Sequence, residues 1–190
     1  MITDKSDKTY LTYWNPNKKE PFDMSRIFTD LKYELNGKPT AAFWGSPEDA
    51  EYGWKEWCHD NDFYIGKGGY DFNNPIKWKL EKDSKILQIG RKNEIELVPN
   101  NPLIKYVNIV KDYTDRTVYK NLTVDEKLKT IYNGGSIEID YERMKEDGIV
   151  AVELLDACIG HLFINRLELC FNGWDCESIC VLDPSKIIWL

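Results

Sequence analysis

Short apolar runs separated by turn residues recur along the chain and predict strands. Each run is rich in β-branched or aromatic side chains, which fit the pleated and partly covered surface of a sheet. Glycine, proline or asparagine follows several of the runs and ends them. The predicted strands are residues 9–14, 40–45, 84–90, 94–98, 136–140, 149–155 and 174–182.

Apolar residues at helical spacing, together with capping signals, predict short helices between these strands. Thr123 and Glu126 have the spacing of a capping box, in which each side chain bonds the backbone N–H of the other residue. Gly148 follows the last of these helices and is typical of a helix end. The three helices predicted in this way are residues 24–36, 123–132 and 141–147.

A fourth helix is predicted directly after the strand at residues 40–45. Ser46 has the side chain of an N-cap, Pro47 suits the first helical position, and two acids follow in the first turn. We therefore expect the helix to begin at Ser46. Further along, Trp54 and Trp57 fall on one helical face with an alanine and a cysteine, and we expect that face to be buried.

Strands and short helices mix along the chain without regular alternation, which favours an α+β fold over a doubly wound one. Residues 64–78 are dense in glycine, asparagine and aromatic side chains and are expected to be irregular. Residues 156–172 fit either a helix or an extended hairpin. Because no repeat, linker or low-complexity tract divides the sequence, we expect a single domain over residues 1–190.

The charge, the apolar stretches and the cysteine spacing of the chain limit the kinds of molecule that the protein is expected to bind. The chain has 25 Lys and Arg against 32 Asp and Glu, a net charge of -7, so nucleic acid and anionic membranes are unfavoured partners. No stretch approaches the roughly 20 apolar residues that span a bilayer, and the first residues lack the apolar core of a signal peptide. We expect a cytoplasmic protein whose five cysteines are reduced. The cysteine spacings reproduce no paired zinc motif, so no metal site is expected.

Two carboxylates near the C-terminus are the first candidates for chemistry. Because side chains alternate along a strand, Asp175 and Glu177 are predicted to share a face that continues into Ile179 and Val181. Acids that run into an apolar row fit the rim of a cleft. The alternative is an exposed strand end that carries two solvated acids.

Three blocks of sequence resemble a group of phage and bacterial proteins similar to the mono-ADP-ribosyltransferases. That group carries a "KP-x-G-G-L-W-A-S-P" stretch, a "G-W-x-x-W-C" helix and a terminal "W-D-x-[DE]-S" strand. The blocks here occur in the same order and cover about half of the chain with their surroundings. They read "KPTAAFWGSP", "GWKEWC" and "GWDCESICVLDPSKI".

The resemblance implies an ADP-ribosyltransferase-like split β-sandwich with short flanking helices and NAD held, as substrate, between two small sheets. Glu177 would be the catalytic glutamate, which contacts the nicotinamide ribose and stabilises the positive charge that develops as nicotinamide leaves. Asp175 would be the flanking acid. Ser46 would supply the hydroxyl of the second cleft strand, beside Trp44 in the cleft lining. The helix predicted at Ser46 would offer N–H groups to the pyrophosphate.

The chain departs from the resemblance on its first strand. Relatives carry "H-Y-G" there, whereas this chain has Thr12 and Tyr13 followed by a tryptophan, so the expected His or Arg is missing. Thr12 and Tyr13 become the matching candidates for cofactor binding. Two functions follow: an enzyme that transfers ADP-ribose from NAD to a host macromolecule, or a non-catalytic protein that binds a nucleotide such as ADP-ribose or blocks a host protein. A phage-encoded inhibitor of host defence would fit the second function.

Overall fold

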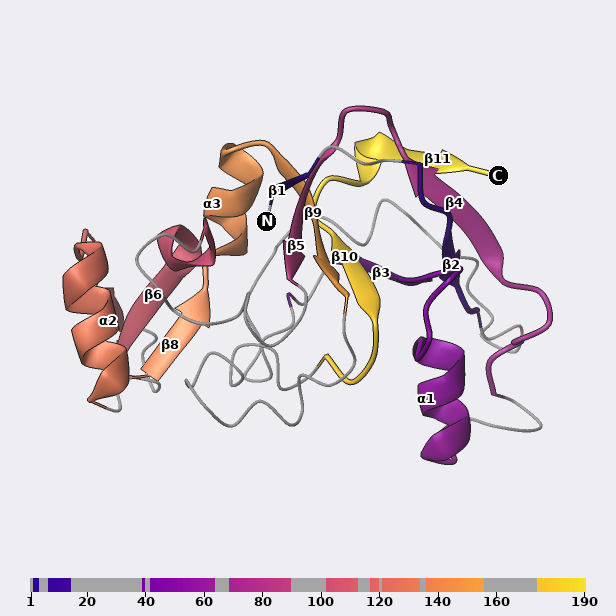
Figure 1. Cartoon of the computed structure of the whole chain (residues 1–190), viewed down its shortest axis with the longest axis horizontal. Helices are drawn as coiled ribbons and strands as arrows, with labels where there is room; N and C mark the ends of the chain where they lie inside the picture. The colour runs from indigo at the N-terminus through magenta and orange to yellow at the C-terminus, as the bar shows by residue number, and fades with distance from the viewer. Residues whose placement is uncertain are drawn as a thin grey trace.

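Strands from distant parts of the chain assemble into one large mixed sheet (Figure 1). The computed structural model describes residues 2–3, 7–14, 39, 42–63, 69–89, 102–112, 117–119, 121–133, 136–155 and 174–190. Within these ranges the eight strands of the large sheet follow the order β1-β5-β9-β10-β3-β2-β4-β11. They are β1 (Ile2–Thr3), β2 (Tyr10–Thr12), β3 (Phe43–Pro47), β4 (Ile76–Leu80), β5 (Lys85–Ile89), β9 (Ile149–Leu154), β10 (Ser178–Val181) and β11 (Ile187–Trp189).

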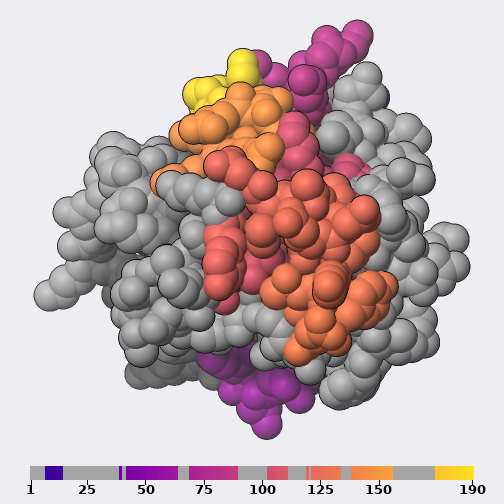
Figure 2. All heavy atoms as spheres, turned by 90° about the vertical axis from the view of Figure 1, so that its left-hand side faces the viewer, coloured from indigo at the N-terminus to yellow at the C-terminus, as the bar shows by residue number. Residues whose placement is uncertain are grey.

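A small second sheet and three short helices complete the described part of the α+β fold. The second sheet has the order β7-β6-β8, and its strands are β6 (Val107–Asp112), β7 (Thr117–Tyr119) and β8 (Ser136–Ile139). The helices are α1 (Trp54–Asp60), α2 (Val124–Tyr132) and α3 (Tyr141–Glu146). Figure 2 shows α2 and α3 on one face of the molecule, with the segment of α1 at the lower edge. No helix in the described ranges is long and apolar enough to cross a membrane.

Strand β3 is the centre of the large sheet because its two ends pair with different strands. Its first three residues, from Phe43 to Gly45, lie opposite Val181 to Ile179 of β10. Its last two residues, Ser46 and Pro47, lie opposite the first two residues of β2. The sheet therefore has two wings that meet at β3, one reaching β1 and the other reaching β11.

The two faces of the large sheet support two separate cores. One core lies between the sheet and the layer formed by the second sheet, α2 and α3, and it includes Cys180 and Trp174. The other core joins side chains of both wings: Tyr10 and Trp78 from one wing pack with Ile86 and Ile179 from the other. Alternate residues of β10 thus serve alternate cores, as strand geometry requires.

Gly45 allows the second core to close against the middle of β3. A Cβ atom at this position would lie 2.7 Å from Cζ2 of Trp78 and 3.1 Å from the carbonyl oxygen of Leu11. Any larger residue would therefore push the Trp78 ring away from β3. The apolar run at residues 40–45 ends in glycine for this packing reason, and the strand continues two residues beyond it.

Several predicted elements are confirmed, and their ends have the expected caps. Thr123 and Glu126 form the capping box of α2, with Thr123 N–H donating to Glu126 Oε2 at 2.8 Å. Helix α3 is capped by Asp140, and Gly148 beyond it has a φ of +78, which favours glycine. The strands predicted at residues 84–90, 136–140 and 149–155 correspond to β5, β8 and β9, and the α+β class holds.

Other element boundaries were wrong. The helix predicted to begin at Ser46 begins at Trp54, because Ser46 and Pro47 remain in β3, paired with β2. Residues 76–78, the end of the stretch expected to be irregular, belong to β4. The last predicted strand is shorter and begins at Ser178. Three predicted segments, residues 24–36, 94–98 and 156–172, lie outside the described residues.

Candidate functional site

The three sequence blocks that carry the resemblance come together on neighbouring elements. Strand β10 follows the "GWDC" segment and pairs with β3, which holds Trp44 and Ser46. Strand β3 in turn pairs with β2, which holds Thr12. Helix α1, from the "GWKEWC" block, begins beside the end of β3 (Figure 1). We call the place where β2, β3, β10 and the start of α1 meet the corner.

The ring of Trp44, on β3, packs against the ring of Trp174 in the segment that precedes β10. Its centroid lies 4.6 Å from that of Trp174 in an edge-to-face arrangement, the geometry that aromatic pairs prefer. Trp44 is half-buried, whereas Trp174 is buried in the core beneath the second sheet. The indole of Trp44 therefore forms part of the corner next to the residue that precedes Asp175.

The two candidate acids lie just before β10 and differ in exposure. Asp175 is exposed, whereas Glu177 is half-buried. Both belong to an irregular segment, because the strand itself begins at Ser178. The prediction that strand alternation puts both acids on one face therefore loses its basis. Backbone bonds fix Glu177 instead: its N–H donates to the carbonyl oxygen of Tyr52 at 3.0 Å, which ties it to the segment before α1.

Ser46 is buried and uses its hydroxyl to hold α1. Its Oγ accepts a hydrogen bond from the Trp54 N–H at 2.9 Å, so it satisfies a free donor at the first residue of the helix. The Gly53 N–H is also engaged, with Glu56 Oε2 at 3.1 Å. Ser46 thus caps a helix, as its residue type suggested, although the helix begins eight residues later in the sequence. These two N–H groups already have acceptors within the chain.

Thr12 points into the second core, away from Trp44 and Ser46. Its hydroxyl donates to the carbonyl oxygen of Trp44 at 2.7 Å and accepts from Trp78 Nε1 at 2.9 Å. Its side chain therefore couples β2, β3 and β4. Of the residues predicted to bind a cofactor, Thr12 is the one that lies across the sheet from the others.

Tyr13 lies on the α1 side of β2. Its ring centroid is 5.2 Å from that of Phe72. Burial raises the pKa of the Tyr13 hydroxyl, and the nearby carboxylate of Glu56 raises it further. Tyr52, the residue bonded to Glu177, also has a raised pKa, first through burial and then through a hydrogen bond to Asp60. Both hydroxyls therefore stay protonated at neutral pH beside an acidic helix.

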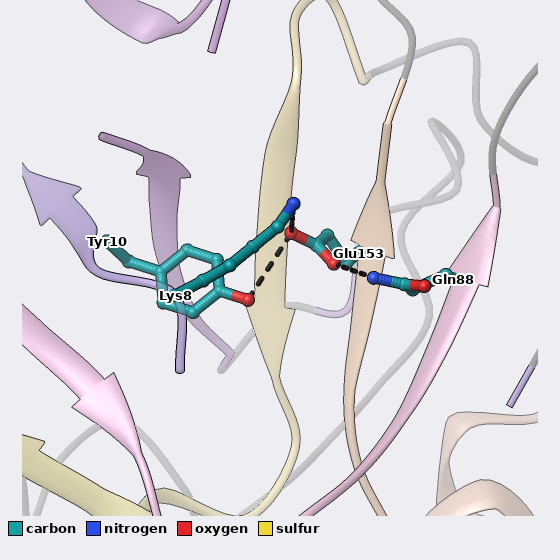
Figure 3. Close-up of polar contacts among 4 residues, drawn as sticks. All are labelled: Lys8, Tyr10, Gln88 and Glu153. Atoms are coloured by element: carbon teal, nitrogen blue, oxygen red, sulfur yellow. Dashed lines mark hydrogen bonds and ion pairs between the residues drawn. The ribbon is translucent and has the colours of Figure 1, made fainter. Parts of the chain in front are cut away.

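A buried carboxylate that sequence reasoning missed lies in the second core. Glu153 of β9 is fully buried, and its two oxygens have three donors (Figure 3). Oε1 accepts from Lys8 Nζ at 3.1 Å and from the Tyr10 hydroxyl at 3.3 Å, and Oε2 accepts from Gln88 Nε2 at 2.6 Å. Such pairing is what a buried charge requires. We call these four residues the Glu153 cluster.

The Glu153 cluster connects both wings of the sheet to the corner. Tyr10 stacks on Trp78 with ring centroids 4.8 Å apart, and Trp78 donates to Thr12, which donates to the Trp44 backbone. Burial, and then the charge of Glu153, raises the pKa of Tyr10 strongly, so this hydroxyl remains a donor. An acid within the apolar run "IVAVELL" was the available signal in the sequence. Its partners lie 65 to 145 residues away and could not be identified from spacing.

Three candidate residues near the corner have aromatic or acidic side chains that are half-buried. Trp44 and Tyr13 provide aromatic surface, and Glu177 provides a half-buried carboxylate anchored through its backbone. Among the described residues, no group of His, Cys, Asp and Glu has the arrangement to hold a metal ion. Comparison of the chain with family models, curated proteins and solved structures gives no match.

Proposed function

We propose that the chain is an ADP-ribosyltransferase-like protein that binds NAD at the corner and transfers ADP-ribose to a host macromolecule. The observation that supports it is the convergence of the sequence blocks: segments more than 100 residues apart in the chain, "AAFWGSP" and "GWDCESICV", pair as neighbouring strands. A split β-sandwich that opens at β3 is the finer fold expected under this proposal. The two wings that meet at β3 are consistent with it.

In the proposed reaction, the bond between the nicotinamide nitrogen and the ribose carbon breaks. The bonding electron pair leaves with nicotinamide, and positive charge develops on the ribose. Glu177 would accept a hydrogen bond from a ribose hydroxyl and stabilise that charge, an effect that is strongest where water is excluded. The acceptor then forms a bond to the ribose carbon and releases a proton.

A second candidate function is a non-catalytic nucleotide-binding or partner-blocking protein on the same scaffold. Thr12 supports this alternative, because its hydroxyl already bonds Trp78 and Trp44 and its side chain carries no charge. A His or Arg on this strand would instead offer a cation or extra donors to the adenosine ribose. Because this chain has no His or Arg at that position, the argument for catalysis is weakened more than the argument for nucleotide binding.

The two functions differ in how nicotinamide release depends on Glu177. Incubation with NAD and a host lysate should release nicotinamide and label an acceptor if the protein is an enzyme. Glu177→Gln should then lower release about 100-fold or more, because it removes the charge that stabilises the transition state. Glu146→Gln, at an exposed acid on α3, is the matched control and should retain activity.

The remaining outcomes separate the alternatives. Thermal stabilisation by NAD or ADP-ribose without nicotinamide release would favour the non-catalytic binder. Release that is equal in the two variants would mean that Glu177 is not the catalytic acid. Absence of both release and stabilisation would contradict any nucleotide site at the corner.

A further inference from the structure

A cluster of aromatic rings extends along α1 and the segments beside it. The two indoles of the helix, Trp54 and Trp57, stack with centroids 5.0 Å apart and planes 11° from parallel. Phe63 packs edge-on against both of them. The rings continue from Trp54 through Tyr70 and Phe72 to Tyr13. We call these six residues the aromatic cluster.

The aromatic cluster is only partly covered by the rest of the chain. All six of its members are half-buried, and none belongs to either hydrophobic core. The sequence predicted that one face of α1 is buried. On that face Cys58 is fully buried, whereas the two indoles are only half-buried. Figure 1 shows α1 projecting from the end of β3, away from the layer that contains α2 and α3. Apolar rings on a projecting helix are available to a partner.

Exposed carboxylates lie in and beside the helix that carries the two indoles of the aromatic cluster. Residues 48–62 contain six acids and one lysine, so this stretch has more than its share of the chain's negative charge. All six are exposed: Glu48, Asp49, Glu51, Glu56, Asp60 and Asp62. Lys77 pairs with Glu48 at its border, and both of these side chains are largely exposed. The other five acids form no ion pair with any of the described residues.

The negative charge and the rings occupy the same region of the surface. Glu56 lies on α1 between the two indoles in sequence, and it contributes to the raised pKa of Tyr13 after burial does. Asp60 accepts from the Tyr52 hydroxyl at the other end of the helix. A ligand that reaches the rings therefore also enters the field of several carboxylates, within a Debye length of about 8 Å at physiological salt.

We propose that α1 and the aromatic cluster form a docking surface for a basic polypeptide segment, one in which arginine side chains reach the stacked indoles. A guanidinium group is planar, stacks on indole faces and keeps its charge, and the carboxylates on and beside α1 attract it. Nucleic acid, the other common ligand of exposed aromatic rings, is repelled by the same carboxylates. Charge complementarity thus selects a cationic protein partner.

The docking surface adjoins the corner, although it does not depend on NAD chemistry. Tyr13 belongs to both places, and the bond from Glu177 N–H to Tyr52 O joins the irregular segment before β10 to the start of α1. A partner seated on α1 would lie beside Glu177. Under the enzyme function that partner would be the acceptor, and under the non-catalytic function it would be the protein that is blocked.

Fluorescence anisotropy with a labelled peptide of alternating arginine and glycine tests the proposal on the full chain. The double variant Glu56→Gln/Asp60→Asn should weaken binding about tenfold, since it removes two nearby charges. Glu142→Gln/Glu146→Gln, which removes two exposed acids from α3, is the matched control and should change binding less than about twofold. Trp57→Leu should weaken binding about fivefold while all the acids remain.

Three results would overturn the proposal. Equal weakening in the two acid pairs would mean that the peptide follows net charge and not α1. Unchanged binding in folded Trp57→Leu would mean that the rings play no part, and circular dichroism would establish that the variant is folded. Tighter binding of a single-stranded RNA probe than of the peptide would assign the surface to nucleic acid.

One further result would support the proposal: weaker binding of a lysine-glycine peptide than of the arginine-glycine peptide.

Discussion

At the scale of single residues, a few polar side chains each hold several elements of the fold together. Thr12 couples three strands through one hydroxyl, and Ser46 begins a helix that lies beyond its own strand. Glu153 also joins distant elements, because its carboxylate accepts hydrogen bonds from donors in both wings of the sheet. Such groups stabilise the fold only while every partner is present.

Loss of Lys8 tests this dependence on partners. Lys8→Met should lower the free energy of unfolding by about 2 kcal/mol, because it removes the cation from a carboxylate that is fully buried. Lys77→Met is the matched control: its pair with Glu48 is about half exposed on both sides, so its loss should cost less than about 1 kcal/mol. Urea unfolding measures both. A Lys8 effect no larger than that of Lys77 would contradict the structural role of the cluster.

At the scale of elements, a local signal determines where α2 begins. Helix α2 begins where its capping box predicts, since Thr123 and Glu126 satisfy each other's N–H groups with no help from the rest of the chain. The pKa of Glu126 lies below its ordinary value because the hydroxyl and N–H of Thr123 both donate to it. A lowered carboxyl pKa stabilises the fold above the ordinary value and loses that effect as pH falls through the folded value.

Thr123→Ala should therefore destabilise the protein by about 1 kcal/mol at neutral pH, through loss of the cap. The difference from the wild type should shrink as pH falls through the lowered pKa of Glu126, because the protonated side chain no longer gains from the two donors of Thr123. Thr130→Ala is the control on the same helix: its hydroxyl donates to the carbonyl oxygen of Glu126, and alanine is the better helix former. Thermal unfolding across pH should separate the two variants; a larger loss in Thr130→Ala would contradict the argument.

The sequence did not predict the boundaries of elements that depend on pairing with distant strands. Ser46 and Pro47 have the local signature of a helix start, yet pairing with β2 keeps them in a strand. Residues 76–78 look irregular among their aromatic neighbours, yet they belong to β4, which pairs with β2 and β11. The candidate site followed the same rule. Its segments were identified from local motifs, whereas the orientation of Thr12 and the partners of Glu153 required the fold.

At the scale of the whole molecule, two wings of one sheet meet at β3. That topology brings the segments of β2, β3, β10 and α1 to one corner and leaves α1 projecting with its acids. The net charge of -7 is thus uneven: residues 48–62 hold six of the 32 acids and one of the 25 basic residues. The corner and the docking surface are neighbours for the same topological reason.

We propose that NAD binds at the corner, and an NMR titration of the indole N–H groups can test this proposal. Addition of NAD should shift the Trp44 indole resonance in a saturable manner. The resonance of Trp189, on edge strand β11, should remain unchanged and serves as the internal control. An unchanged Trp44 resonance at saturating NAD, or an equal shift of both indoles, would contradict the proposal.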